Sequence, residues 1–145
     1  MKKWVIPQEN GVSILRLLVM RIVYAITGIL FGVQTWQTLI VERGNFEPFE
    51  GVAFAYWGAL SILMLIGLRF PLKMLPLLLL QFLYKVTWLI FVGSPLQQAG
   101  LLDENAKSLF DAMQMGAIID LIAIPWIFAA KHYLGGFFQR QNKQV

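Results

Sequence analysis

Four long apolar runs place the strongest limit on what this 145-residue chain can fold into. They occupy residues 14–40, 52–68, 74–92 and 112–130. An α-helix needs roughly 20 apolar residues to cross the hydrocarbon core of a membrane, and each run is near or above that length. Runs of this continuous apolarity do not alternate as barrel strands do, so each must satisfy its backbone hydrogen bonds as a helix. The sequence predicts an all-α integral membrane four-helix bundle that forms one domain over residues 1–145.

Composition supports this class and argues against several others. Charged residues make up only 14% of the chain, against about 25% in a soluble domain. There are no cysteines and one histidine, so disulfides and thiolate catalysis are excluded and no metal site is expected. No catalytic constellation, glycine-rich phosphate loop or cofactor motif is present, so the sequence leans against an enzyme and predicts no cofactor.

The basic residues sit at the ends of the apolar runs, which predicts an orientation rather than a nucleic-acid partner. One side collects nine of them: Lys2, Lys3, Arg16, Arg21, Arg69, Lys73, Lys131, Arg140 and Lys143. The other side collects only Arg43 and Lys107. The positive-inside rule then places both termini in the cytoplasm. The expected location is a bacterial inner (plasma) membrane, with the lipid bilayer as the first partner.

Two charges, Lys85 and Asp120, fall well inside the third and fourth apolar runs. A charge at that depth is costly and normally faces the protein interior with a partner. Counting from the midpoint of each run places both residues at nearly the same depth, so we expect an ion pair if the last two helices are antiparallel neighbours. Three interpretations remain open: a structural ion pair, a ligand or proton site, or two charges that do not meet.

Further polar and aromatic residues fall near that depth. On the third run Gln81, Lys85 and Trp88 share one helix face, because they recur at i, i+4 and i+7. The full set of predicted ligand- or proton-site residues is Lys85, Asp120, Gln34, Gln81, Tyr84 and Trp88.

Glycines predict where helices approach one another. Gly28 and Gly32 form a GxxxG pattern, which favours contact with another helix of the same chain or of a second copy, and Gly116 lies on the face of Asp120. Pro125 predicts a kink that frees the carbonyl of Leu121, beside Asp120. Residues 93–111 are expected to form a long outer loop containing one short amphipathic turn at 103–110.

The runs LRLLVMRIVYAITGILFGVQTW (15–36) and ILMLIGLRFP (62–71) resemble the DoxX-like family of small four-helix membrane proteins. The similarity covers an arginine at the start of the first span, the two glycines within it and the Gly67-Leu68-Arg69 exit of the second span. The lysine expected soon after those glycines is missing, and Lys85 and Asp120 cannot be carried over from the family. The resemblance implies an accessory role in a membrane redox system.

The function predicted from the residues is a small membrane protein whose buried Lys85/Asp120 site binds or translocates a small ligand or a proton. The alternatives are a DoxX-like accessory subunit and a purely structural or assembly subunit. A membrane-protein partner and a homo-oligomer both stay open, and no nucleic acid is expected.

Overall fold

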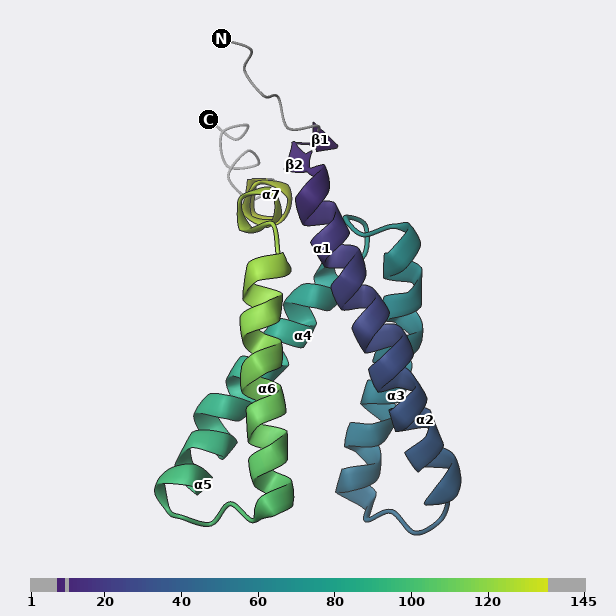
Figure 1. Cartoon of the computed structure of the whole chain (residues 1–145), viewed down its shortest axis with the longest axis vertical. Coiled ribbons are helices and arrows are strands. Elements are labelled where there is room, and N and C mark those ends of the chain that lie inside the picture. The colour runs from purple at the N-terminus through teal and green to yellow at the C-terminus, as the bar shows by residue number, and fades with distance from the viewer. Residues whose placement is uncertain (1–7, 10, 136–145) are drawn as a thin grey trace, which may run out of the picture. The chain divides into compact units, whose positions relative to one another are not determined.

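The computed structural model describes residues 8–9 and 11–135, and these are predominantly helical (Figure 1). The basic residues predicted to mark the cytoplasmic termini, Lys2, Lys3, Arg140 and Lys143, lie outside the described residues. The elements in chain order are β1 (Gln8–Glu9), β2 (Val12–Ser13), α1 (Ile14–Ala25), η1 (Ile26–Phe31), α2 (Gly32–Val41), α3 (Pro48–Arg69), α4 (Leu75–Trp88), η2 (Leu89–Gly93), α5 (Ser94–Gln98), α6 (Glu104–Ala123), α7 (Trp126–Ala129) and η3 (Ala130–Leu134). The three η elements are π-helical segments, and β1 pairs with β2 in a two-stranded sheet.

The described residues divide into two compact units, one over residues 13–77 and one over residues 78–135 together with 8–9 and 11–12. The prediction of a single domain over the whole chain stays a prediction. Within the described residues, three helices are long and apolar enough to cross a membrane: Ile14–Val41, Pro48–Arg69 and Leu75–Gln98. A fourth candidate consists of two helices joined by a bend of 71°.

The first unit is an antiparallel pair of long helices. Its first helix runs without interruption through α1, η1 and α2, and the Ser13 side chain caps its start by accepting from the Arg16 N–H at 3.3 Å. Its second helix, α3, begins at Pro48, whose missing N–H costs nothing at that position. The Glu47 side chain caps α3 by accepting hydrogen bonds from the backbone N–H groups of Phe49 and Glu50.

Glycines of the GxxxG pattern bring these two helices of one chain close together. A Cβ at Gly28 would lie 2.8 Å from Leu65 Cδ2, and a Cβ at Gly32 would lie 2.9 Å from Ser61 Cβ. Nearer the end of α3, Gly67 lies against the ring of Tyr24, whose hydroxyl donates to the Pro71 carbonyl at 3.0 Å. The small-residue face of the first span is therefore used by α3 of the same chain.

In the second unit, α4, η2 and α5 form one continuous helix that extends beyond the predicted end at residue 92. The π-helical η2 precedes Pro95, and the helix continues to Gln98. A π-helical turn shifts the hydrogen-bond pattern just where proline supplies no N–H. The prediction of a loop over 93–111 is therefore wrong at its start.

The loop prediction is also wrong at its end. The segment expected as a short turn at 103–110 is the start of the long helix α6, which the Asp103 side chain caps by accepting from the Ala106 N–H at 2.7 Å. At the other end, α6 stops at Ala123 because Pro125 supplies no N–H and would clash with the carbonyl one turn earlier. The chain bends there by 71° into α7 and η3, so the kink predicted at Pro125 is present and divides the predicted span 112–130 between two helices.

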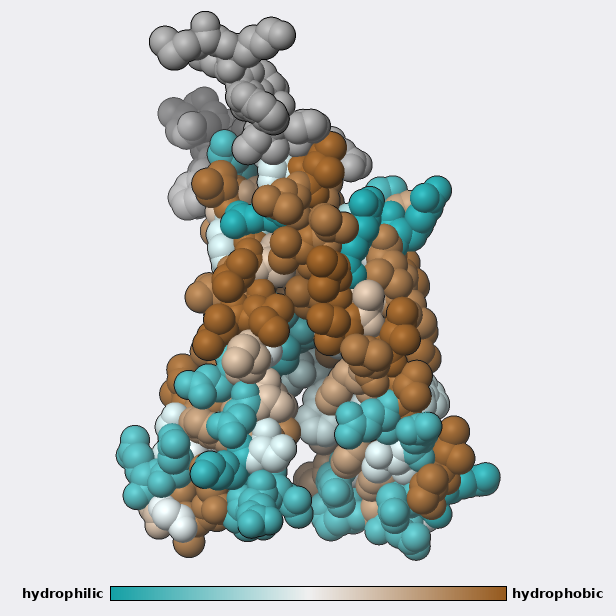
Figure 2. Space-filling view, viewed as in Figure 1, coloured by the Kyte–Doolittle hydropathy of each residue, from teal (hydrophilic) through white to brown (hydrophobic). Residues whose placement is uncertain are grey.

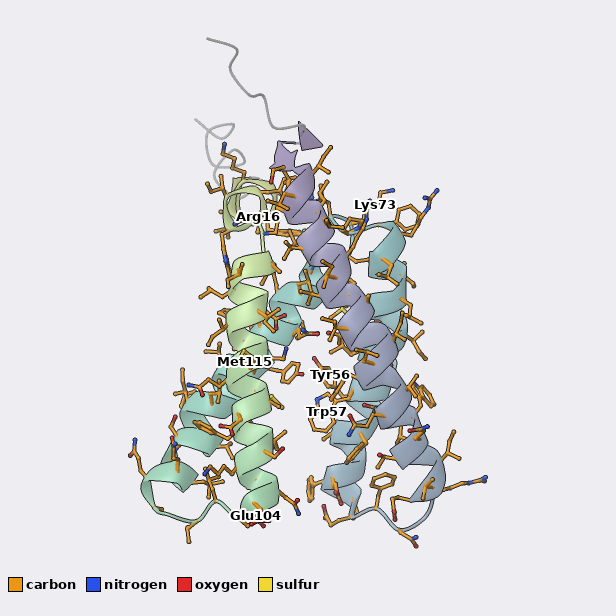
Figure 3. The ribbon with its side chains drawn as sticks, in the orientation of Figure 1. Arg16, Tyr56, Trp57, Lys73, Glu104 and Met115 are labelled. Carbon is orange, nitrogen blue, oxygen red and sulfur yellow. The ribbon has the colours of Figure 1, made fainter. Side chains whose placement is uncertain are left out.

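On the face that Figure 2 shows, apolar residues predominate along the helix shafts, and hydrophilic residues gather at the lower ends of both units. In the first unit, exposed apolar residues include Ile29, Leu30 and Val33, and in the second they include Ile118, Leu121 and Ile122. Figure 3 shows Arg16 and Lys73 at the same end of the first unit, whereas Tyr56 and Trp57 lie partway along α3. A belt of exposed apolar side chains between charged ends is the pattern that a bilayer requires.

Candidate polar site on α4 and α6

The antiparallel contact between α4 and α6 places the site. Figure 1 shows the two helices crossing. Trp88 lies beside Phe110, with ring centroids 6.4 Å apart, and Phe82 meets Trp126 edge to face at 5.3 Å. Between these two aromatic contacts, α4 carries Lys85 and α6 carries Asp120.

The predicted ion pair is present in the structure. Lys85 Nζ donates to Asp120 Oδ2 at 2.8 Å. The Asp120 side chain is only 1% exposed, and the Lys85 side chain is 12% exposed. A carboxylate buried to this degree needs a charged or strongly hydrogen-bonding partner, and Lys85 supplies both.

Gln81 is the third member of the site. Its amide Nε2 donates to Asp120 Oδ1 at 2.8 Å, so each oxygen of the carboxylate accepts one side-chain hydrogen bond from α4. Gln81 lies one turn before Lys85 on the same face, which is the spacing that the sequence predicted. We call Gln81, Lys85 and Asp120 the triad.

Gly116 makes room for Lys85. A Cβ at this position would lie 2.7 Å from Lys85 Nζ and 3.0 Å from Lys85 Cε, which is closer than an unstrained side chain allows. Gly116 lies one turn before Asp120 on α6, so the lysine side chain passes over the glycine to reach the carboxylate. The sequence predicted a close helix approach at Gly116, and the space is occupied by the partner charge itself.

The remaining predicted site residues fall in different places. Trp88 lies next to the triad along α4, and its ring contacts Phe110 near Gly93. Tyr84 directly precedes Lys85 and is half-buried. Gln34 belongs to the first unit, where its side chain is exposed on α2, so its membership of the site stays a prediction.

Two contacts made by the helices of the site were not anticipated. The carbonyl of Leu121, expected as a free acceptor beside Asp120, accepts instead from the Trp126 indole N–H at 2.9 Å. Phe110 was assigned to a loop, although it lies three residues before Met113 and seven before Ala117, on the same buried face of α6. Extending the helical pattern back to Asp103 would have placed it beside Trp88.

Gln81 and Lys85 each have hydrogen-bonding capacity that the triad does not use. Gln81 Oε1 is buried and has no hydrogen-bond partner among the described residues. The Lys85 ammonium has three N–H donors, and within the described part of the chain one hydrogen bond, to Asp120, is formed. The arrangement can therefore still accept one hydrogen bond and donate others.

The described residues contain no group of three or more His, Cys, Asp or Glu side chains that could hold a metal ion. Comparison of the chain with protein-family models, with curated proteins and with solved structures gave no match. The resemblance of the first two spans to DoxX-like proteins therefore stays a prediction from their residues.

Proposed function

We propose that the chain is an integral membrane protein with four crossings and cytoplasmic termini, and that the triad binds a small polar ligand or a proton. The observation that carries the proposal is the unused hydrogen-bonding capacity of Gln81 and Lys85 around a fully buried Asp120. Ionisable groups at membrane depth often mark binding sites and transport paths. If the triad served only to neutralise the charge of Asp120, Lys85 would be sufficient and Gln81 would not be needed.

A structural role is the second candidate, and one observation favours it. Both oxygens of Asp120 are already hydrogen-bonded within the chain, which ties α4 to α6 without any ligand. In this case the pair specifies which faces of the two helices meet. Polar contacts between membrane helices contribute about 0.6 kcal/mol on average, so the gain would be helix register more than stability.

The ion pair itself is tested by comparing Lys85→Met, Asp120→Asn and the double variant in a membrane mimetic. Each single change leaves a buried group without its partner, so we expect each to lower the free energy of unfolding by about 3 to 5 kcal/mol. The double change removes both charges and should recover most of that loss. The measurement is thermal or denaturant unfolding of the purified protein in lipid nanodiscs.

The same variants test binding. A panel of small alcohols, ketones, acids and amines is added to the wild-type protein and to the folded double variant. A binding site predicts at least one compound that raises the melting temperature of the wild type but not that of the double variant. If every compound shifts both proteins equally, the triad binds none of these compounds and the structural role is the better explanation of the pair.

A further inference from the structure

The orientation of the Gln81 amide is fixed by its neighbour. Asp120 Oδ1 is an acceptor, so the amide must present its NH₂ group to the carboxylate, and a flipped amide would place two oxygens against each other. Gln81 Oε1 is consequently directed away from Asp120 and has no donor among the described residues, although the residue is only 2% exposed. A buried carbonyl without a donor is unfavourable, so the site is incomplete without a donor group.

The unused donors of Lys85 and this unused acceptor belong to two side chains that hydrogen-bond the same carboxylate. Both side chains come from one face of α4 and converge on the two oxygens of one carboxylate, each at 2.8 Å. A single small group near Asp120 can therefore accept from the ammonium and donate to Gln81 Oε1. A hydroxyl does both, whereas a ketone, ether or ester oxygen only accepts.

The charges of the triad select against ions. Lys85 and Asp120 cancel, and Gln81 is neutral. The nearest other charged residues on the same two helices are Lys107 and Asp111, at the far end of α6. An added anion or cation would be left with no countercharge in a low-dielectric region, which is costly. A neutral ligand avoids this cost.

The surroundings of the triad are apolar. Trp88 and Phe110 lie beside it along α4 and α6, and the residues flanking Gly116 on α6 include the exposed Met115 and Ile119. Figure 3 shows Met115 partway along α6, well beyond Glu104 at the start of the helix. A ligand that reaches Lys85 past these side chains must carry its hydroxyl on an apolar body.

We infer that the triad binds the hydroxyl group of a neutral, membrane-soluble alcohol, which accepts a hydrogen bond from Lys85 and donates one to Gln81 Oε1. This inference rests on the proposed function, since it names the ligand class of the same site. Gln81 is the residue that distinguishes an alcohol from other neutral amphiphiles.

The test uses the full chain in lipid nanodiscs with three probes of equal chain length: decan-1-ol, decan-2-one and decanoate. Apparent affinities are taken from the rise in melting temperature with probe concentration, after subtraction of the rise seen for the Lys85→Met/Asp120→Asn variant. On the wild-type protein we expect decan-1-ol to bind about fivefold to tenfold more tightly than decan-2-one, the value of one additional hydrogen bond. Decanoate should bind more weakly than decan-1-ol.

Gln81→Leu supplies the second comparison, with Gln98→Leu as the matched control, because Gln98 is exposed at the end of α5. We expect Gln81→Leu to remove the preference for the alcohol, so that the two neutral probes bind equally, while Gln98→Leu leaves the preference unchanged. The comparison of probes on the wild-type protein stands even if Gln81→Leu does not fold.

The outcomes separate the two proposals. If decan-2-one or decanoate binds the wild type as tightly as decan-1-ol, the alcohol assignment is overturned while the triad remains a binding site. If Gln81→Leu folds and keeps the preference for the alcohol, the assignment of Gln81 as its acceptor is overturned. If none of the three probes binds the wild type more tightly than the double variant, the alcohol assignment fails. If the panel of small compounds also gives no shift specific to the wild type, the proposed ligand site fails with it.

Discussion

Lys85 is held by two residues of α6 that lie one turn apart, Gly116 and Asp120. Asp120 supplies the countercharge at 2.8 Å, and Gly116 supplies the space through which the lysine side chain reaches it. Gln81 then occupies the second carboxylate oxygen. A larger residue at position 116 should therefore weaken the ion pair, although both charged residues are unchanged.

We predict that Gly116→Ala lowers the free energy of unfolding by about 1 to 2 kcal/mol, because the new Cβ would lie 2.7 Å from Lys85 Nζ. Thermal unfolding in nanodiscs measures the effect. The matched control is Gly135→Ala, also in a helical segment, where a Cβ would meet nothing within 4 Å and the change should be neutral or slightly stabilising.

The physical reason is tested by repeating Gly116→Ala in the Lys85→Met/Asp120→Asn background. The shorter uncharged side chain can move away from the new methyl group, so most of the loss should disappear there. An equal loss in both backgrounds would show that the glycine serves helix approach alone.

At the scale of elements, caps and prolines move the ends of helices away from the ends of apolar runs. Asp103 starts α6 in a stretch that hydropathy assigns to a loop, and Pro125 ends the same helix inside a stretch that hydropathy assigns to a span. The contacts between helices depend on these ends. Phe110 reaches Trp88 only because α6 starts early, and Trp126 reaches the Leu121 carbonyl only because the chain bends at Pro125.

The glycine contact between α2 and α3 gives a prediction at this scale. Gly32→Ala should lower the free energy of unfolding by about 1 to 2 kcal/mol, since its Cβ would lie 2.9 Å from Ser61 Cβ. Gly51→Ala in α3 is the control, because its Cβ would meet Phe46 at an ordinary 3.4 Å. Unfolding and light scattering on the same samples measure stability and oligomeric state together.

The contact within one chain predicts that Gly32→Ala leaves the oligomeric state unchanged. A shift toward monomer, with unfolding of the monomer unaffected, would instead assign the GxxxG face to a second copy.

At the scale of the whole molecule, charge at the helix ends sets the proposed orientation. In the first unit, Arg16 and Lys73 lie at one end, whereas Glu47 and Glu50 lie at the start of α3. In the second unit, Glu104 lies at the start of α6. The positive-inside rule then assigns the turn after α3 to the cytoplasm and the loops before α3 and α6 to the outer side.

Single cysteines test this orientation without background, because the chain contains none. In intact cells we expect a membrane-impermeant thiol reagent to label Asn45→Cys and Ser108→Cys, and to label Phe70→Cys only after permeabilisation. All three side chains are exposed, so lack of labelling would report the side of the membrane. Labelling of Asn45→Cys and Ser108→Cys from opposite sides would contradict an even number of crossings between them.

Much of the fold could be predicted from residues close together in the chain. Three of the four predicted spans are helices long and apolar enough to cross a membrane. The pairing of Lys85 with Asp120 followed from sign and position, because two isolated charges in apolar runs have few other partners. The end of α5 and the start of α6 could not be predicted from the apolar pattern. A π-helical turn carries the helix through to the end of α5, and an aspartate cap starts α6.

The sequence by itself determined that the chain is all-α, where most of its apolar helices lie, and which two charges inside them could pair. Hydropathy and helical period depend on each residue and its near neighbours, so they can be read without a structure. Only the tertiary structure decided that Gln81 takes the second oxygen of Asp120, that Gly116 holds Lys85, and that Leu121 is bonded by Trp126. These contacts depend on how far each helix is rotated and shifted against its neighbour, and close packing of side chains fixes that only when both helices are in place.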